Sequence, residues 1–200
     1  MSTYRMHTIL TENDIRRLKV KDVLYITGVV VTARDQAHKR ALEFQKDKKK
    51  LPFELEGNVI YHCGPVMRRQ PNGNWVVVSA GPTTSTRLEK YEAEFLRAFK
   101  PRIIVGKGGM GQKTMKSLVS FGAAYCTFTG GAAVLAAEAI SRVRDVAWLD
   151  LGMPEAMWLL EVKDFGPLVV AIDSYGRNLY SEIERKAQVN KQDIFQRMEL

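Results

Sequence analysis

Residues 102–131 read RIIVGKGGMGQKTMKSLVSFGAAYCTFTGG. The run RIIV is short, apolar and rich in β-branched residues, so it predicts a strand that ends in the glycine-rich loop GKGGMG. Residues 113–121 predict a helix that Gly122 terminates, and residues 123–128 predict the next strand. A strand, a helix and a second strand in immediate succession indicate an α/β fold with parallel pairing.

The same alternation extends to both sides of this stretch. Residues 22–33 predict a strand, or a bent strand pair around Gly28. Residues 75–80 (WVVVSA) predict a buried strand because their apolar side chains do not alternate with polar ones. The remaining predicted strands are 58–62, 143–150, 158–162 and 168–173, and the remaining predicted helices are 88–99, 132–140 and 181–198, with a weaker one after residue 33.

We therefore expect an α/β fold in one compact domain over residues 1–200, strand-rich at its start and alternating strands with helices thereafter. Residues 1–20 carry no clear pattern, and we expect them to pack loosely or against a partner.

The composition is that of a globular chain. Of 200 residues, 46% are hydrophobic and 26% charged, which excludes a disordered tail, a fibrous repeat and a disulfide-stapled scaffold. Thirty Lys and Arg against 22 Asp and Glu leave a net charge of +8, which favours an anionic partner: nucleic acid, a membrane or an acidic small molecule. The basic run KDKKK (46–50) lacks interleaved aromatic residues, so a solvated helix end is favoured over a nucleic-acid site.

Two cysteines, Cys63 and Cys126, lie far apart and form neither a CxxC pair nor a zinc-type spacing. They indicate a reduced, cytoplasmic chain that cannot by itself supply four thiolates to an iron–sulfur cluster, and we predict no metal ligands in this chain. The first residues show no signal-peptide pattern, and no run of about 18 apolar residues predicts a membrane span.

Four loops follow predicted strands and precede predicted helices. They are residues 33–38 (ARDQAH), 81–87 (GPTTSTR), 106–111 (GKGGMG) and 129–131 (TGG). Ligands of α/β sheets collect at the carboxyl ends of strands, and the free N–H groups of a helix start favour anions. We therefore expect an anion site on these loops.

Each loop also has a purely structural interpretation. The hydroxyls of GPTTSTR could cap a helix, although Arg87 in a first helical turn opposes the helix dipole unless an anion is bound. GKGGMG does not match the phosphate-binding Walker pattern and could be a flexible turn with a solvated Lys107. Arg34 and His38 share a face if residues 34–38 are helical, but Arg34 could equally form a surface ion pair. In GMPEAMW (152–158), Glu155 could serve only a turn.

Taken together, the motifs resemble the β subunit, or C-terminal domain, of class I fumarate hydratase and of its relative L-tartrate dehydratase. The resemblance runs in order from about residue 20 to residue 180 through ARDQAH, YHCGPV, GPTTSTR, GKGGM, TGGAA, LGMPEAMW and DFGPLVVAIDSYGRNLY. Leu88 departs from the family pattern, where we expect methionine. The combination of GPTTSxR, GKGGM and GMPEAxW is specific to this family.

The resemblance implies a swivelling β/β/α domain and a hydro-lyase that adds water reversibly to fumarate to give L-malate, or that dehydrates tartrate. It implies a 4Fe–4S cluster held by an α subunit, and therefore a hetero-oligomer of α and β chains that is inactive as β alone. It implies that Arg34, Arg87 and Lys107 bind the substrate carboxylates. Thr83 is the implied base, and His38 a neighbouring substrate contact.

Two other classes of function remain as alternatives. The net charge and KDKKK would suit a nucleic-acid-binding module, whose binding should depend on salt. A stand-alone anion-binding or regulatory domain would use the same loops without a partner.

Overall fold

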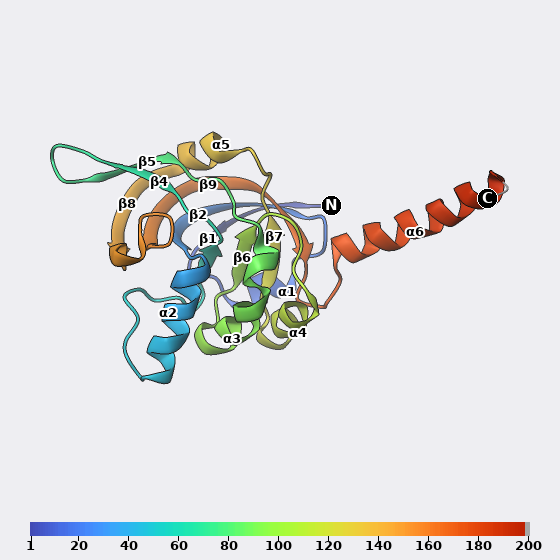
Figure 1. Cartoon of the computed structure of the whole chain (residues 1–200), viewed down its shortest axis with the longest axis horizontal. Helices are drawn as coiled ribbons and strands as arrows, with labels where there is room; N and C mark the ends of the chain where they lie inside the picture. The colour runs from blue at the N-terminus through green and yellow to red at the C-terminus, as the bar shows by residue number, and fades with distance from the viewer. Residues whose placement is uncertain (199–200) are drawn as a thin grey trace.

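The computed structural model describes residues 1–198 and confirms an α/β fold (Figure 1). The strands are β1 (Thr3–His7), β2 (Val23–Thr32), β3 (Val59–Tyr61), β4 (Val66–Arg69), β5 (Trp75–Ser79), β6 (Ile103–Gly106), β7 (Ala124–Thr127), β8 (Ile140–Ala147) and β9 (Met157–Ile172). The helices are α1 (Glu12–Arg16), α2 (Asp35–Lys46), α3 (Glu89–Phe99), α4 (Gln112–Phe121), α5 (Ala133–Glu138) and α6 (Leu179–Arg197), with 3-10 turns at Ser85–Leu88 and Leu149–Leu151.

The main sheet closes on itself. Its order is β1-β2-β3-β6-β7-β9-β8, and β9 also pairs with β2, so that β2, β3, β6, β7 and β9 form a ring. The strands β2, β3, β6 and β7 run parallel, as the sequence predicts, and β9 is antiparallel to both of its ring neighbours. β4 and β5 form a separate two-stranded hairpin.

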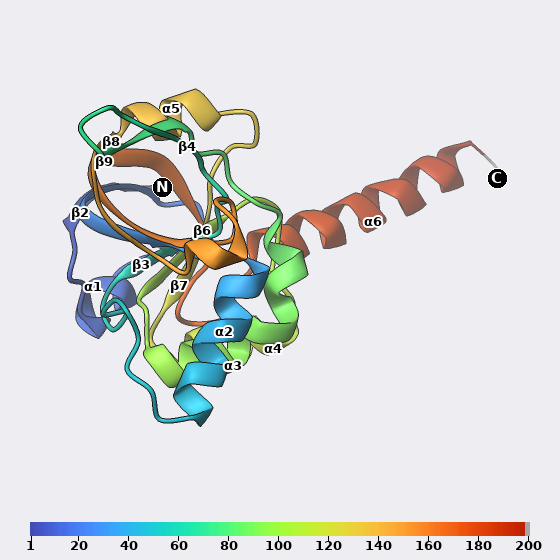
Figure 2. The same cartoon turned by 60° about the vertical axis from the view of Figure 1, so that its left-hand side comes forward.

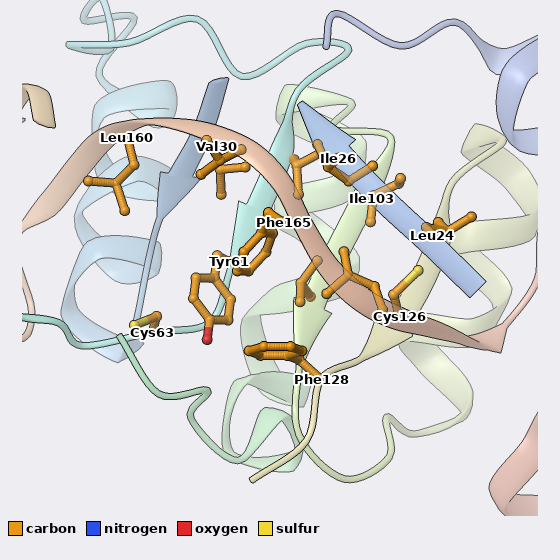
Figure 3. Close-up of a cluster of buried hydrophobic side chains, with 14 of the residues drawn as sticks. Leu24, Ile26, Val30, Tyr61, Cys63, Ile103, Cys126, Phe128, Leu160 and Phe165 are labelled. Carbon is orange, nitrogen blue, oxygen red and sulfur yellow. The ribbon is translucent and has the colours of Figure 1, made fainter. Parts of the chain in front are cut away.

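Three layers result from this closure. Figures 1 and 2 show α2, α3 and α4 along one side of the parallel strands, while β8 and β9 curve over the other side. One buried cluster, which includes Tyr61, Phe128 and Phe165, fills the space inside the closed sheet (Figure 3). A second cluster, which includes Phe95 and Leu118, lies between the sheet and the helices. The arrangement agrees with the β/β/α architecture that the resemblance implies.

The C-terminal strand pair of the sequence prediction is wrong, because β9 is one strand of 16 residues. The Gly166-Pro167 pair lies between the predicted strands 158–162 and 168–173 but does not separate two strands. It lies instead where the strand bends, with β2 on one side along much of its length and register shifts between Leu24, Ile26 and Gly28. Bulges and bends are the positions where a strand tolerates proline, and here the bend closes the sheet.

Two further expectations differ from the structure. β5 is half-buried rather than buried, because it belongs to the outlying hairpin and not to the main sheet. The first 20 residues are not loosely packed: β1 pairs in parallel with β2, and Ile15 and Leu18 are fully buried in the core. The sequence pattern of these residues was weak because β1 is short and only Met6 of its five residues is buried.

The C-terminal helix α6 confirms the predicted helix and projects away from the rest of the domain in both views (Figures 1 and 2). None of its described residues is buried. Among residues 1–198, no helix combines the length and the apolar character needed to cross a bilayer.

Candidate functional site

The predicted loops meet at the carboxyl ends of the parallel strands. Beyond β3 and β6 the two strands separate, and residues 82–85 insert between them. The backbone N–H of Thr83 donates to the carbonyl of His62 (2.6 Å), and Thr83 accepts from the N–H of Lys107 (3.1 Å). Short bridges join Cys63 to Pro82 and Thr84 to Lys107. The proposed base is therefore fixed by the main chain between two strand ends.

Lys107 is bonded to this insertion by its main chain, Arg87 follows the insertion in the chain, and both offer free positive charge. In residues 1–198, neither side chain has a carboxylate within ion-pair distance. Arg87 is exposed and Lys107 is half-buried. A Cβ placed on Gly130 would lie 3.5 Å from Cδ of Lys107, so the third loop lies beside this lysine. Unpaired cations on adjacent loops suit a small anion with more than one carboxylate.

The glycine-rich loop 106–111 is held on several sides rather than flexible. The Tyr125 hydroxyl donates to the carbonyl of Gly108 (2.8 Å), and the Thr86 hydroxyl donates to that of Gly109 (3.2 Å). The N–H of Gly111 donates to the carboxylate of Glu89 (2.7 Å). Lys107 therefore projects from an ordered support.

The hydroxyls of GPTTSTR do not cap the following helix, so the interpretation of this loop as a helix cap is wrong. Thr84 occupies the N-cap position without a side-chain hydrogen bond. The Ser85 hydroxyl is fully buried and hydrogen-bonds with the Tyr125 hydroxyl (2.9 Å), and His62 Nδ1 lies at 2.9 Å from the same Ser85 oxygen. Thr86 serves the glycine-rich loop. The hydroxyls of Ser85 and Thr86 thus bind other segments of the chain, and Thr83 is held through its backbone.

Arg34 lies next to residues 62–64 and pairs with Glu155, across 3.2 Å from Nη2 to Oε1. Both side chains are largely covered, with 23% and 20% exposed. The second oxygen of Glu155 accepts from the backbone N–H of Gln36 at the start of α2 (2.9 Å). A Cβ on Gly64 would lie 2.6 Å from Nη1 of Arg34, so the glycine makes room for the guanidinium. The ion pair of Arg34 is therefore a half-buried link to GMPEAMW and not the surface ion pair of the alternative interpretation.

His38 does not join the other predicted residues on the open face. Its ring is fully buried, with Nε2 3.4 Å from Oε2 of Glu92 and Nδ1 2.8 Å from the carbonyl of Arg34. Nε2 of His62 lies 3.0 Å from the same Oε2 atom of Glu92. His38 thus supports the backbone of Arg34 from behind.

Burial and charge act in opposite directions on this cluster. Burial alone would raise the pKa of the Glu92 carboxyl, whereas its contacts with His62 and His38 lower that pKa, and the lowering prevails. Burial lowers the pKa of His62 despite the adjacent carboxylate, which favours a neutral imidazole. The ligand atoms of His38, His62 and Glu92 all lie within 4.8 Å of one another, so this group could hold a metal ion.

The sequence interpretation missed four residues of the site. Glu155 was assigned only to a turn, and Ser85 only to helix capping. His62 and Glu92 were not singled out, because a lone histidine in a short strand and a glutamate in a helix carry no local signal. The polar residues Ser85 and Glu92 sit on the buried side of their segments, which is the one sign that sequence could have offered.

Fold and loops together define the class of protein. Residues 3–183 match the family model described as "Fumarase C-terminus", and the chain belongs to that family, as the motifs indicated.

The relatives carry more particular names. The L(+)-tartrate dehydratase subunit beta of Escherichia coli strain K12 is 44% identical over 88% of this chain and 85% of its own length. A protein of Methanocaldococcus jannaschii, provisionally named with the same subunit, is 47% identical over 88% of this chain and 91% of its own. A provisionally named class I fumarate hydratase of Geobacillus stearothermophilus is 47% identical over 89% of this chain but 34% of its own length.

Proposed function

We propose that this chain is the β subunit of a hydro-lyase that interconverts a 2-hydroxy dicarboxylate and its dehydrated product, with fumarate and L-malate as the first pair to test. The observation that carries the proposal is the position of Thr83, whose backbone is bonded to His62 and to Lys107, in the same loop as Arg87. The names of the relatives supply tartrate as the second substrate to test.

Dehydration of a 2-hydroxy acid removes a proton from the carbon next to a carboxylate and expels hydroxide from the neighbouring carbon. The electron pair left by the proton moves first onto the carboxylate oxygens, where fixed cations stabilise it. The proposed cations for this step are Lys107, whose main chain is bonded to Thr83, and Arg87 of the same loop as Thr83. Arg34 is proposed for the distal carboxylate, because its guanidinium can bind two oxygens in parallel.

Thr83 is the proposed base. A threonine alkoxide is costly at neutral pH, so the hydroxyl needs positive charge close by to lower that cost. Lys107, whose main chain is bonded to Thr83, is the proposed source. His38 is proposed to act on the site through the Arg34 backbone rather than on the substrate.

An iron–sulfur cluster does not fit the residues of this chain. Cys63 and Cys126 are fully buried inside the closed sheet (Figure 3), and burial raises the pKa of both thiols. We therefore assign the 4Fe–4S cluster that the family resemblance implies to an α subunit, where it would supply the Lewis acid for the departing hydroxide. Because Cys63 and Cys126 are free thiols, we propose the reducing cytoplasm as the location of this chain.

The test is reconstitution. The chain is co-expressed with its α subunit without oxygen, the cluster content is verified, and fumarate hydration and tartrate dehydration are followed by absorbance. We expect turnover of one of these substrates by the complex and none by either chain alone. A complex with intact cluster that converts neither fumarate, malate nor tartrate would contradict the proposal.

A further inference from the structure

Three metal-binding side chains from three different elements meet in the interior, behind the proposed site. His38 lies on α2, His62 directly follows β3, and Glu92 lies on α3. Figures 1 and 2 both show α2 and α3 side by side. All three side chains are fully buried, and their ligand atoms lie within 4.8 Å of one another. Two imidazoles and one carboxylate are a common donor set for a divalent transition metal.

The facing atoms have no aligned hydrogen-bond partner. This holds within residues 1–198 for Nε2 of His38, Nε2 of His62 and both carboxylate oxygens of Glu92. Buried polar atoms are almost always satisfied, and a buried carboxylate without partners is costly. The contacts of 3.4 Å and 3.0 Å between the two Nε2 atoms and Oε2 are close to the ~3.3 Å that separates two tetrahedral ligands of one ion.

The outward-facing nitrogens support the same interpretation. Nδ1 of His38 lies 2.8 Å from the carbonyl of Arg34, which can only accept, so Nδ1 carries a hydrogen and Nε2 is the nitrogen left to bind a metal ion. Nδ1 of His62 lies 2.9 Å from the Ser85 hydroxyl oxygen. Metal-bound histidines typically donate their other N–H to such a carbonyl or hydroxyl.

We propose that His38, His62 and Glu92 bind one Zn²⁺ ion, through the two Nε2 atoms and both oxygens of Glu92. Nitrogen and carboxylate donors suit zinc, whereas calcium and magnesium require oxygen ligands throughout. Because the three side chains are fully buried, the ion has no open position for a substrate and is structural. It joins α2 and α3 to the end of β3 and thereby holds the backbone carbonyl of Arg34 and the hydroxyl of Ser85. This inference does not depend on the proposed hydro-lyase activity.

The full-length chain is purified without chelators, and its metal content is measured by mass spectrometry. We expect one zinc ion per chain, a lower Tm after removal of the metal with a strong chelator, and recovery of the Tm when Zn²⁺ is restored. Replacement by Co²⁺ should give the visible absorption of a four-coordinate site with nitrogen and oxygen ligands.

The variants His62→Gln and Glu92→Gln should lose the ion. The matched controls are His7→Gln and Glu94→Gln, which change an exposed histidine and an exposed glutamate of the same helix as Glu92. Both controls should keep one ion per chain. If His62→Gln and Glu92→Gln do not fold, the wild-type chain refolded with Zn²⁺ or Co²⁺ decides the question. A wild-type chain that takes up neither metal overturns the proposal, and so does a folded Glu92→Gln chain that retains its zinc.

Discussion

The backbone N–H of Lys107 donates a 3.1 Å hydrogen bond to the carbonyl oxygen of Thr83. This bond fixes the proposed cation and the proposed base relative to each other by main chain alone, so either side chain can be changed without moving the other. The adjacent Gly108 is held in turn by the Tyr125 hydroxyl. The site can therefore be dissected one side chain at a time.

Removal of either unpaired cation should impair catalysis without affecting the fold. In the complex with the α subunit, Lys107→Ala and Arg87→Ala should each lower kcat/KM by ~100- to 1000-fold, the usual loss when one stabilising donor is removed from developing charge. Neither side chain is buried, so the free energy of unfolding should change by no more than about 0.5 kcal/mol. Steady-state kinetics and thermal unfolding measure the two effects.

The control for this pair is Lys90→Ala, which removes an exposed cation from α3 over the ring of Tyr91. Its kinetics should match those of the wild type. Wild-type kcat/KM in both Lys107→Ala and Arg87→Ala would remove these residues from the site.

The hydroxyl of Thr83 should be required, but its methyl group should not. Thr83→Val keeps the shape and removes the proton acceptor, so kcat should fall by ~100- to 10,000-fold, the range for loss of a positioned acid or base. Thr83→Ser restores an oxygen in the same place and should recover most of the rate. If Thr83→Val turns over as fast as Thr83→Ser, Thr83 is not the base.

Much of this architecture could be predicted from the sequence, and whether an element was predicted depended on how clear its local pattern was. The central strand–helix–strand unit was predicted correctly because β6, α4 and β7 each show their own local pattern. The bend in β9 was not predicted, because the pair Gly166-Pro167 is compatible both with a loop between two strands and with a bend inside one strand. The contact between Arg34 and Glu155 joins distant loops that meet only when β9 returns alongside β2.

The Arg34–Glu155 pair should position the guanidinium for substrate. Glu155→Gln keeps an acceptor for the Gln36 N–H but removes the charge facing Arg34, so the guanidinium loses its fixed orientation. We expect KM to rise several-fold with a smaller change in kcat, and the free energy of unfolding to fall by about 1 kcal/mol, since the pair is only partly exposed. The expectation is wrong if Glu155→Gln leaves KM unchanged while Arg34→Ala raises KM.

Both thiols should resist modification in the folded chain. Burial raises the pKa of Cys63 and of Cys126, so each stays protonated at pH 8 and out of contact with solvent. A thiol reagent should therefore label neither cysteine in the native chain and both after unfolding in guanidinium. Rapid labelling of one cysteine under native conditions would show that the closed sheet opens around it.

Any side chain at position 106 should lower the free energy of unfolding as long as Ser85 keeps its hydroxyl. A Cβ at Gly106 would lie 1.9 Å from Oγ of Ser85 and 3.2 Å from Nδ1 of His62, with no flexible side-chain end to give way. Gly106→Ala should thus destabilise the chain by about 1–3 kcal/mol, the usual cost of overpacking, whereas Gly130→Ala, whose nearest neighbour lies at 3.5 Å, should not. Adding Ser85→Ala to Gly106→Ala removes the clashing oxygen and should recover part of the lost stability in denaturant unfolding. If the double variant is as unstable as the sum of the two single changes, the clash with Ser85 is not what excludes alanine at position 106.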